Sequence, residues 1–244
     1  MHVFCTQCGG ALVEPALSDR FMNAFPATET SGGLTLEWVR GPGADEGAAL
    51  ELRQGEQSIG TQGVVSLAGD AHASAHHARV TLANGALRVA DTGSDNGTWV
   101  RLRGAEFSLG DGDLFRVGEQ WLRFDLHAAH DAPTDGQEIA GTPLRPWRLK
   151  VTQLLEGGGE GLVYSTRRDR LAFGRVDCDV NFIGDSYVSG SHCELRWREG
   201  AVVLRDLGSL NGTFVALPKG VDVALQEGDE IGLGRHLLRV IPAT

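Results

Sequence analysis

The amino-acid sequence predicts an all-β protein made of two tandem copies of one β-sandwich. Three observations support this fold class. Residues 91–100 (DTGSDNGTWV) recur as residues 206–215 (DLGSLNGTFV), at an offset of 115 positions. Short apolar or alternating runs, such as residues 78–82, lie between turns rich in Gly, Asn and Asp. No window holds a sustained 3.6-residue period, so short strands are expected throughout, as in a sandwich or barrel.

The repeat continues through further blocks in the same order. The block Ser74-Ala-His-His77 recurs as Ser189-Gly-Ser-His192, and Gly112-Asp113 recurs as Gly228-Asp229. The closing strands, residues 122–124 and 238–240, keep nearly the same offset. Several blocks in one order at a nearly constant spacing indicate that the chain contains the same fold twice.

The predicted domain boundaries follow from this repeat. The first copy spans residues 34–127 and the second spans 145–244, and each is long enough to bury its own core. Residues 128–144 lack periodicity and are predicted to be a linker. Residues 1–33 form an N-terminal segment with a Cys-x-x-Cys pair, followed by a stretch to which no element is assigned.

The charge distribution excludes several classes of function. The formal net charge is −10, and the whole acidic excess lies before Arg145. An acidic chain without a basic cluster is a poor ligand for nucleic acid or for an anionic membrane surface. No apolar leader follows Met1, and the four cysteines do not form a disulfide framework, so we expect the reducing cytoplasm.

The motifs of the second copy resemble those of the forkhead-associated (FHA) family. They are Gly174-Arg175, Ser189-Gly-Ser-His192, Gly208-Ser-Leu-Asn-Gly-Thr213 and Gly228-Asp229. This resemblance implies an eleven-stranded β-sandwich in which the loops at one end hold a phosphothreonine peptide. Across both copies it covers nearly all of the chain after the N-terminal segment.

The resemblance also implies the residues that contact the phosphopeptide. Arg175 is the expected phosphate anchor, because a guanidinium offers a charged, forked set of donors to the phosphate oxygens. Ser189 adds a hydroxyl donor, and Asn211 is expected to bond the peptide backbone. Leu210 and Gly190 complete the predicted contact set. Gly190 departs from the family, since many relatives carry a basic side chain there.

Three further residues are predicted to support the site without touching the ligand. By resemblance, His192 braces the loops through hydrogen bonds. Gly174 and Gly212 are expected to form turns where the chain bends sharply.

The first copy departs from the pattern and is predicted to be degenerate. Thr61 follows Gly60 where the anchor arginine is expected, and Asp95 places a carboxylate beside the expected phosphate position. Two neighbouring anions repel one another when no cation is present. We therefore expect a sandwich that does not bind phosphothreonine, serving as a spacer, a dimerisation surface or a phosphate-independent docking face.

Cys5 and Cys8 resemble the first knuckle of a zinc ribbon. A tetrahedral zinc site needs four ligands, and no second Cys-x-x-Cys follows in the sequence. A zinc ion at Cys5 and Cys8 would therefore be shared between chains or completed by another protein. No cofactor is otherwise expected.

No enzymatic activity is predicted. The segment 182–186 resembles the first block of GDSL-type esterases, but no histidine has an aspartate three residues before it, so Ser186 lacks a base. The sequence favours a non-catalytic signalling adaptor whose partner is a phosphothreonine-containing protein, either a Ser/Thr kinase or its substrate. The alternative is a structural scaffold or oligomerisation protein in which neither copy binds phosphopeptide.

Overall fold

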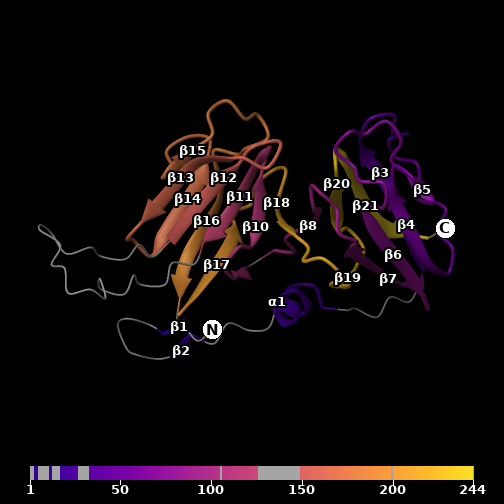
Figure 1. Cartoon of the computed structure of the whole chain (residues 1–244), viewed down its shortest axis with the longest axis horizontal. Coiled ribbons are helices and arrows are strands. Elements are labelled where there is room, and N and C mark those ends of the chain that lie inside the picture. Colours follow the sequence, from indigo (N-terminus) through magenta and orange to yellow (C-terminus); the bar gives the residue numbers. More distant parts are fainter. Residues whose placement is uncertain are drawn as a thin grey trace, which may run out of the picture. The chain divides into compact units, whose positions relative to one another are not determined.

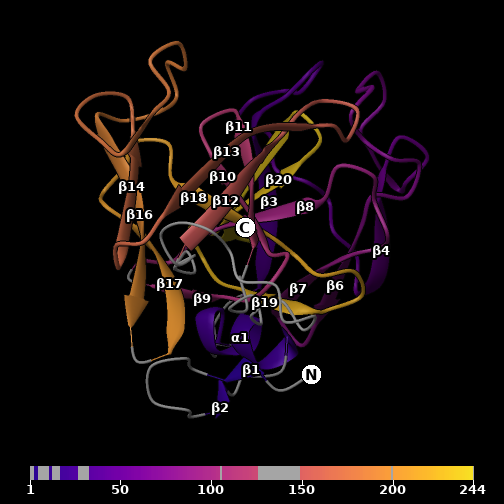
Figure 2. The same ribbon diagram turned by 60° about the vertical axis from the view of Figure 1, so that its left-hand side comes forward.

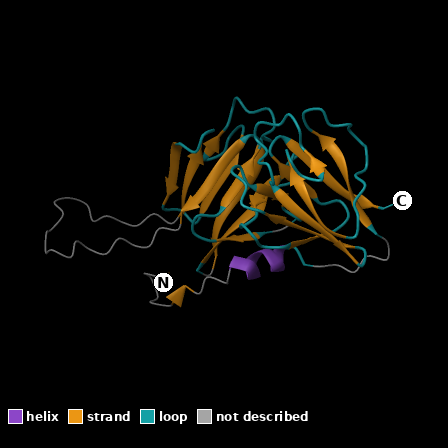
Figure 3. Ribbon diagram, turned by 45° about the vertical axis from the view of Figure 1, so that its right-hand side comes forward, coloured by secondary structure: helices purple, strands orange, loops and turns teal. Residues whose placement is uncertain are grey.

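The structure is a computed structural model that describes residues 3–4, 11–12, 17–26, 33–104, 106–125, 149–198 and 200–243. In the described part, every regular element except one short helix is a β-strand, which confirms the predicted all-β class (Figures 1 and 3). Among the described residues, no helix has the length and apolar character needed to cross a membrane. The chain divides into two compact units, and each unit contains two layers of hydrogen-bonded strands.

The first of these, named here the Arg175 unit, comprises residues 104–213 together with the N-terminal 15 residues. Four of its strands are hydrogen-bonded in the order β13-β12-β11-β10, and five others form a sheet in the order β15-β14-β16-β17-β9. The bounds are β9 (Phe107–Leu109), β10 (Leu114–Val117), β11 (Gln120–Asp125), β12 (Leu149–Leu154), β13 (Glu160–Thr166), β14 (Arg170–Gly174), β15 (Val180–Asn181), β16 (Ser191–Arg198) and β17 (Ala201–Asp206). Two short strands, β1 (Val3–Phe4) and β2 (Ala11–Leu12), pair with each other.

The core of the Arg175 unit lies between its two sheets. Side chains alternate along the strands, so that Leu122 and Phe124 of β11 are fully buried while their neighbours are partly exposed. The rings of Phe115 on β10 and Phe173 on β14 meet edge to face, with centroids 5.7 Å apart. This contact joins one sheet to the other, as expected for a sandwich.

The second unit, named here the Ser74 unit, comprises residues 16–103 and 214–244. Its sheets have the orders β18-β8-β20-β21-β3 and β19-β7-β6-β4-β5. The bounds are β3 (Leu34–Arg40), β4 (Gly55–Gly60), β5 (Val65–Ser66), β6 (Ala78–Ala83), β7 (Ala86–Asp91), β8 (Thr98–Arg101), β18 (Thr213–Ala216), β19 (Val223–Leu225), β20 (Glu230–Leu233) and β21 (His236–Pro242).

The two copies exchange their closing strands. Strands β9 to β11 of the first copy pair with β17 and β12 of the second, while β19, β20 and β21 of the second copy pair with β7, β8 and β3 of the first. Figure 2 shows β9 beside β17 and β19 beside β7. The compact units therefore do not coincide with the sequence ranges 34–127 and 145–244. The two sets of closing strands share a sequence pattern, so the repeat alone does not indicate which set pairs with which copy.

A helix, α1 (Leu17–Ala24), lies in the N-terminal segment, where the sequence analysis assigned no element. Phe21 and Phe25 lie one turn apart, are buried, and stack with ring centroids 6.5 Å apart. The guanidinium of Arg103 lies over the Phe25 ring, 5.2 Å from its centroid. Arg103 also donates to Asp229, which anchors the end of α1 in the Ser74 unit.

Candidate functional site

Three loops of the Arg175 unit converge on one another. Arg175 directly follows β14, and its backbone N–H donates to the carbonyls of Ser189 (2.9 Å) and Gly190 (3.0 Å). The backbone N–H of Leu210 donates to the Ser189 hydroxyl oxygen at 3.0 Å. The loops after β14, before β16 and after β17 thus carry the predicted contact residues to one place.

The close approach at Gly174 depends on the absence of a side chain. A Cβ at Gly174 would lie 2.1 Å from the Gly190 carbonyl oxygen and 2.5 Å from the Cys178 sulfur. Because the first of these neighbours is backbone, it cannot move aside cheaply, so only glycine fits at this position. Gly190 itself has open space around its Cα, so its missing side chain leaves room beside Arg175.

Arg175 is exposed, and no carboxylate in the described part of the chain forms an ion pair with it. Ser189 is half-buried, and its hydroxyl oxygen accepts the Leu210 N–H, which leaves the hydroxyl hydrogen available to donate. Leu210 is 83% exposed, so its side chain lies in solvent beside the hydroxyl. The site therefore presents a cation and a hydroxyl donor on the surface.

Asn211 lies in the same loop and is half-buried. Its side-chain amide donates to the backbone carbonyl of Tyr187 at 2.9 Å, which ties the loop after β17 to the loop before β16. With this nitrogen engaged, the amide oxygen of Asn211 stays available as an acceptor.

His192 is fully buried and joins two of the loops. Its Nδ1 accepts the backbone N–H of Ser189 at 3.1 Å, so the hydrogen of the neutral ring is on Nε2, which donates to the Gly212 carbonyl at 3.1 Å. Gly212 has a φ of +78°, a conformation that favours glycine. Both ring nitrogens of His192 are thus engaged with backbone groups of the loops.

Asp206 organises the loop, a role that the sequence analysis missed. Its carboxylate accepts from the backbone of Gly208 and Ser209 (both 2.8 Å) and from the hydroxyls of Ser209 and Thr213 (both 2.6 Å). Burial opposes ionisation, but these hydrogen bonds outweigh it and hold the pKa of Asp206 below its ordinary value. The signal for this role was present, because Asp91 occupies the same place in the first copy and accepts the same set of bonds.

The Ser74 unit repeats this loop frame with two changes. Asn96 donates to the His72 carbonyl at 2.9 Å, as Asn211 does to Tyr187. Thr61 stands in place of Arg175, and its N–H donates to the Ser74 carbonyl. The Ser74 hydroxyl donates to the Asp95 carboxylate at 3.0 Å and accepts the Asp95 N–H at 3.1 Å. The hydroxyl hydrogen is therefore already committed within the chain.

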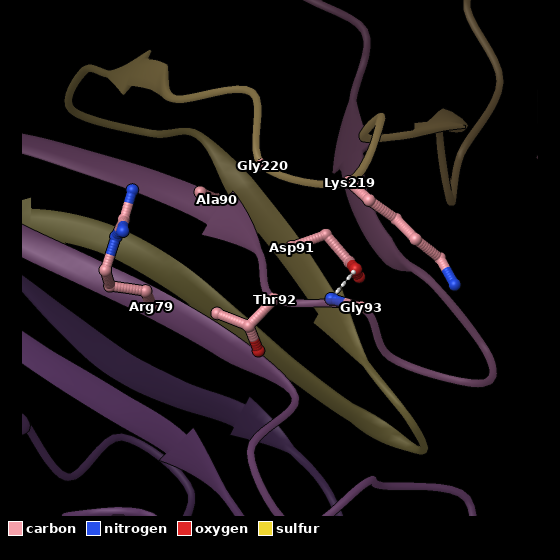
Figure 4. Close-up of a pocket in the computed structure, with 7 residues that line it drawn as sticks. All are labelled: Arg79, Ala90, Asp91, Thr92, Gly93, Lys219 and Gly220. Atoms are coloured by element: carbon pink, nitrogen blue, oxygen red, sulfur yellow. Dashed lines mark hydrogen bonds between the residues drawn. The ribbon is translucent and has the colours of Figure 1, made fainter.

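A cavity of about 460 Å³ lies in the Ser74 unit, beside the end of β7 and the residues that follow it (Figure 4). Its lining is Arg79, Ala90, Asp91, Thr92, Gly93, Lys219 and Gly220. Arg79 is paired with Asp222 through two hydrogen bonds of 2.9 and 3.1 Å, and Asp91 is bonded within its own loop. None of the counterparts of the predicted contact residues lines this cavity.

The predicted zinc ligands Cys5 and Cys8 lie outside the described residues, so zinc binding there stays a prediction. In the described ranges, no three or more His, Cys, Asp or Glu side chains are grouped closely enough to hold a metal ion. Cys178 and Cys193 are free thiols, and burial raises the pKa of Cys193 well above its ordinary value.

Comparison with known proteins identifies several relatives. A family model for the FHA domain matches residues 58–118 and 171–234, which together make up just over half of the chain. The chain is 44% identical over 57 residues to the oxoglutarate dehydrogenase inhibitor of Corynebacterium efficiens, a match covering 23% of this chain and only 40% of that protein. It is 30% identical over 115 residues to the glycogen accumulation regulator GarA of Mycolicibacterium smegmatis, covering 47% of this chain and 72% of GarA.

Two solved structures are also similar. One is an FHA domain studied for its phosphothreonine-dependent interactions, 33% identical, matching 38% of this chain and 96% of that domain with a TM-score of 0.24. The other is the FhaA FHA domain in complex with the intracellular domain of Rv3910, 34% identical, matching 37% of this chain and 97% of that domain with a TM-score of 0.24.

Proposed function

The chain belongs to the FHA domain family, and from this premise we propose that its Arg175 unit binds phosphothreonine-containing segments of other proteins. The chain is a non-catalytic regulatory protein. One observation carries the assignment to this unit: Arg175 is exposed and has no carboxylate partner in the described residues, and its backbone N–H donates to the Ser189 carbonyl at 2.9 Å, which fixes the two residues side by side.

The chemistry of the site suits a phosphate monoester. A phosphothreonine carries about −1.5 to −2 charges at neutral pH and three strong acceptor oxygens. Arg175 supplies a forked cation, and Ser189 supplies a hydroxyl hydrogen that faces no described acceptor. The free amide oxygen of Asn211 accepts a backbone N–H of the bound peptide and so fixes its register.

We further propose that the Ser74 unit does not bind phosphate. Its Ser74 hydroxyl already donates to Asp95, so a carboxylate occupies the position where the phosphate would accept that hydrogen bond. Thr61 offers no charge to offset the repulsion between this carboxylate and an incoming phosphate. This unit serves instead as a spacer, a dimerisation surface or a phosphate-independent docking face.

The proposed partners are a Ser/Thr kinase or its phosphorylated substrates. GarA is named as a regulator of glycogen accumulation, and the corynebacterial relatives are named as inhibitors of oxoglutarate dehydrogenase. Both names describe regulation of another protein or process, which supports an adaptor that acts by binding. The free thiols of Cys178 and Cys193 suit the reducing cytoplasm that the sequence predicts.

Calorimetric titration of the full chain with a degenerate phosphothreonine peptide library tests this proposal. Binding is expected to disappear when the peptides are dephosphorylated and to weaken at least tenfold in Arg175→Ala, because a charge-assisted hydrogen bond contributes about 1.5–3 kcal/mol. Thr61→Ala, at the matching position of the other unit, is the control and is expected to bind like the wild type. Equal binding by the Arg175→Ala variant would exclude the anchor role and favour the structural scaffold.

A further inference from the structure

A hydrogen-bonded clasp joins the first copy of the repeat to the loop that precedes Ser189. Asp185 lies in this loop and is buried. One oxygen of its carboxylate accepts the backbone N–H of Glu119 (2.8 Å) and the side-chain amide of Gln120 (2.9 Å). Residues 118–120 are named here the 118 turn: the first two connect β10 to β11, Gln120 is the first residue of β11, and all three belong to the first copy in sequence.

The clasp continues from Asp185 toward the predicted contact residues. The other carboxylate oxygen of Asp185 accepts the backbone N–H of Tyr187 at 2.9 Å. The carbonyl of the same Tyr187 accepts the side-chain amide of Asn211 at 2.9 Å. Four hydrogen-bonded groups therefore run in sequence from the 118 turn to the residue that sets the peptide register.

The turn also packs tightly against this loop. Gly118 has a φ of +60°, and a Cβ there would lie 2.7 Å from the Asp185 carboxylate and 2.7 Å from a methyl of Val188. Val188 is buried and directly precedes Ser189. Any side chain at Gly118 would push on the loop that carries the hydroxyl donor.

The Ser74 unit has the same clasp with one change. Asp70 accepts the backbone N–H of His72 (2.9 Å) and of Arg235 (2.7 Å), and the His72 carbonyl accepts the Asn96 amide. The position of Gln120 is taken by His236, whose Nε2 lies 3.6 Å from Asp70, beyond hydrogen-bond distance. The amide-to-carboxylate bond thus exists in the Arg175 unit and has no equivalent in the Ser74 unit.

We propose that Gln120 and Gly118, which belong to the first copy, are positioning residues for the phosphothreonine site of the second. Both act through Asp185: Gln120 fixes its carboxylate, and the carboxylate fixes the backbone of Tyr187, on which Asn211 is aligned. The phosphothreonine site is therefore composite, with contact residues from one copy and their support from the other. This inference rests on the proposed function.

The test uses the full chain with Gln120→Glu, which keeps the shape of the side chain. The oxygen of Gln120 that accepts from Gln153 is retained, while the group facing Asp185 changes from donor to acceptor. At pH 7.5 the affinity for a phosphothreonine peptide is expected to fall about three- to tenfold relative to wild type. The ratio of the two affinities should return toward one as the pH falls and the introduced carboxyl gains a proton that it can donate.

A matched pair of glycine variants provides a second test. Gly118→Ala presses on Asp185, and Gly234→Ala presses equally on Asp70, because a Cβ at Gly234 would lie 2.5 Å from that carboxylate. Both glycines have a similar positive φ, so backbone strain is matched. Gly118→Ala should weaken phosphopeptide binding, whereas Gly234→Ala should leave it unchanged.

The outcomes separate this inference from the proposed function. If the wild-type protein binds no phosphothreonine peptide, the proposed function itself is wrong, whatever the variants do. If the wild type binds and Gln120→Glu and Gly118→Ala bind equally well, only the positioning role is overturned. A loss confined to Gly234→Ala would assign the support to the second copy's own turn and would also overturn the inference. A shifted Asn211 side-chain amide resonance in free Gln120→Glu would support it.

Discussion

Ser189 and Ser74 occupy equivalent places, yet their hydroxyls differ in what they can still bind. Each oxygen accepts a backbone N–H from the loop opposite, at 3.0 and 3.1 Å. The hydrogen of Ser74 is donated to Asp95, whereas Leu210 at the position of Asp95 offers no acceptor. A single carboxylate in place of an aliphatic side chain thus determines whether the hydroxyl is available to a ligand.

Restoring the missing groups should therefore create a site in the Ser74 unit. In an Arg175→Ala background, so that only this unit can respond, Thr61→Arg with Asp95→Thr is expected to gain phosphothreonine-peptide binding. The added guanidinium supplies charge, and removal of the carboxylate frees the Ser74 hydroxyl. Calorimetry with phosphorylated and unphosphorylated peptide measures the gain. Absence of any gain would show that the loops differ in more than these two positions.

His236 makes the stability of the Ser74 unit depend on pH. Its side chain is 2% exposed, neither ring nitrogen has a hydrogen-bond partner among the described residues, and the Trp38 ring centroid lies 5.1 Å from that of His236. Burial lowers the pKa of His236 below its ordinary 6.5, and the nearby Asp70 charge offsets this only in part. The unfolded chain therefore binds a proton at His236 more readily than the folded chain does. The free energy of unfolding is thus highest above pH 6.5 and decreases as the pH falls below it.

Urea unfolding at several pH values between 5 and 8 measures this effect. The free energy of unfolding is expected to fall by at most about 1.4 kcal/mol for each pH unit below 6.5. His236→Gln copies the residue found at position 120 and should flatten the dependence while supplying a neutral donor to Asp70. An unchanged slope in that variant would assign the pH dependence to other groups.

At the scale of elements, helix α1 extends the core of the Ser74 unit beyond its strands. Phe21 and Phe25 are 1% and 2% exposed, although the segment is only eight residues long. An isolated helix of this length is unstable in water, so burial of its two aromatic rings accounts for its presence. Arg103 covers one ring and bonds Asp229 at the same time, linking the helix to the turn before β20.

Phe25→Ala is accordingly expected to destabilise the Ser74 unit by about 3–5 kcal/mol, the usual cost of removing a buried aromatic ring. Met22→Ala is the control on the same helix, because Met22 is 58% exposed and its truncation should change stability by about 0.5 kcal/mol or less. Chemical denaturation compares the two variants. Similar values for both would mean that α1 does not contribute to the core.

At the scale of the whole molecule, each unit is built from both copies of the repeat. The Arg175 unit takes β9 to β11 from the first copy, and the Ser74 unit takes β19 to β21 from the second. A cut between the copies should therefore not separate them. With a specific protease site inserted into residues 128–144, the two fragments are expected to co-elute on a sizing column under native conditions and to part only in denaturant. Fragments that separate without denaturant would contradict the exchange of strands.

The repeat in the sequence predicted the fold class and which loops would converge. The motifs around Arg175 and Ser189 marked these loops, and the resemblance to the FHA family implied that they lie at one end of a sandwich. The exchange could not be predicted in this way, because residues 122–124 and 238–240 share a pattern and match either copy equally well. Helix α1 was missed because two phenylalanines four positions apart are too few to establish a period. The repeat marks Asp206, since Asp91 opens the same block in the first copy, but the hydrogen bonds that give Asp206 its role are visible only in the structure.

The exchange of strands also sets the order in which the two units can be completed during synthesis. Strand β3 pairs with β21, so residues near position 36 cannot form their strand pairing until residues near position 240 have been synthesised. Until the last of these leave the ribosome, the strands of the Ser74 unit have open edges, a state prone to mispairing. The Arg175 unit has all of its strands once residue 213 is made. The later copy in the sequence is therefore the first whose unit can close, and the nascent chain already holds the proposed phosphothreonine site while its other half is unfinished.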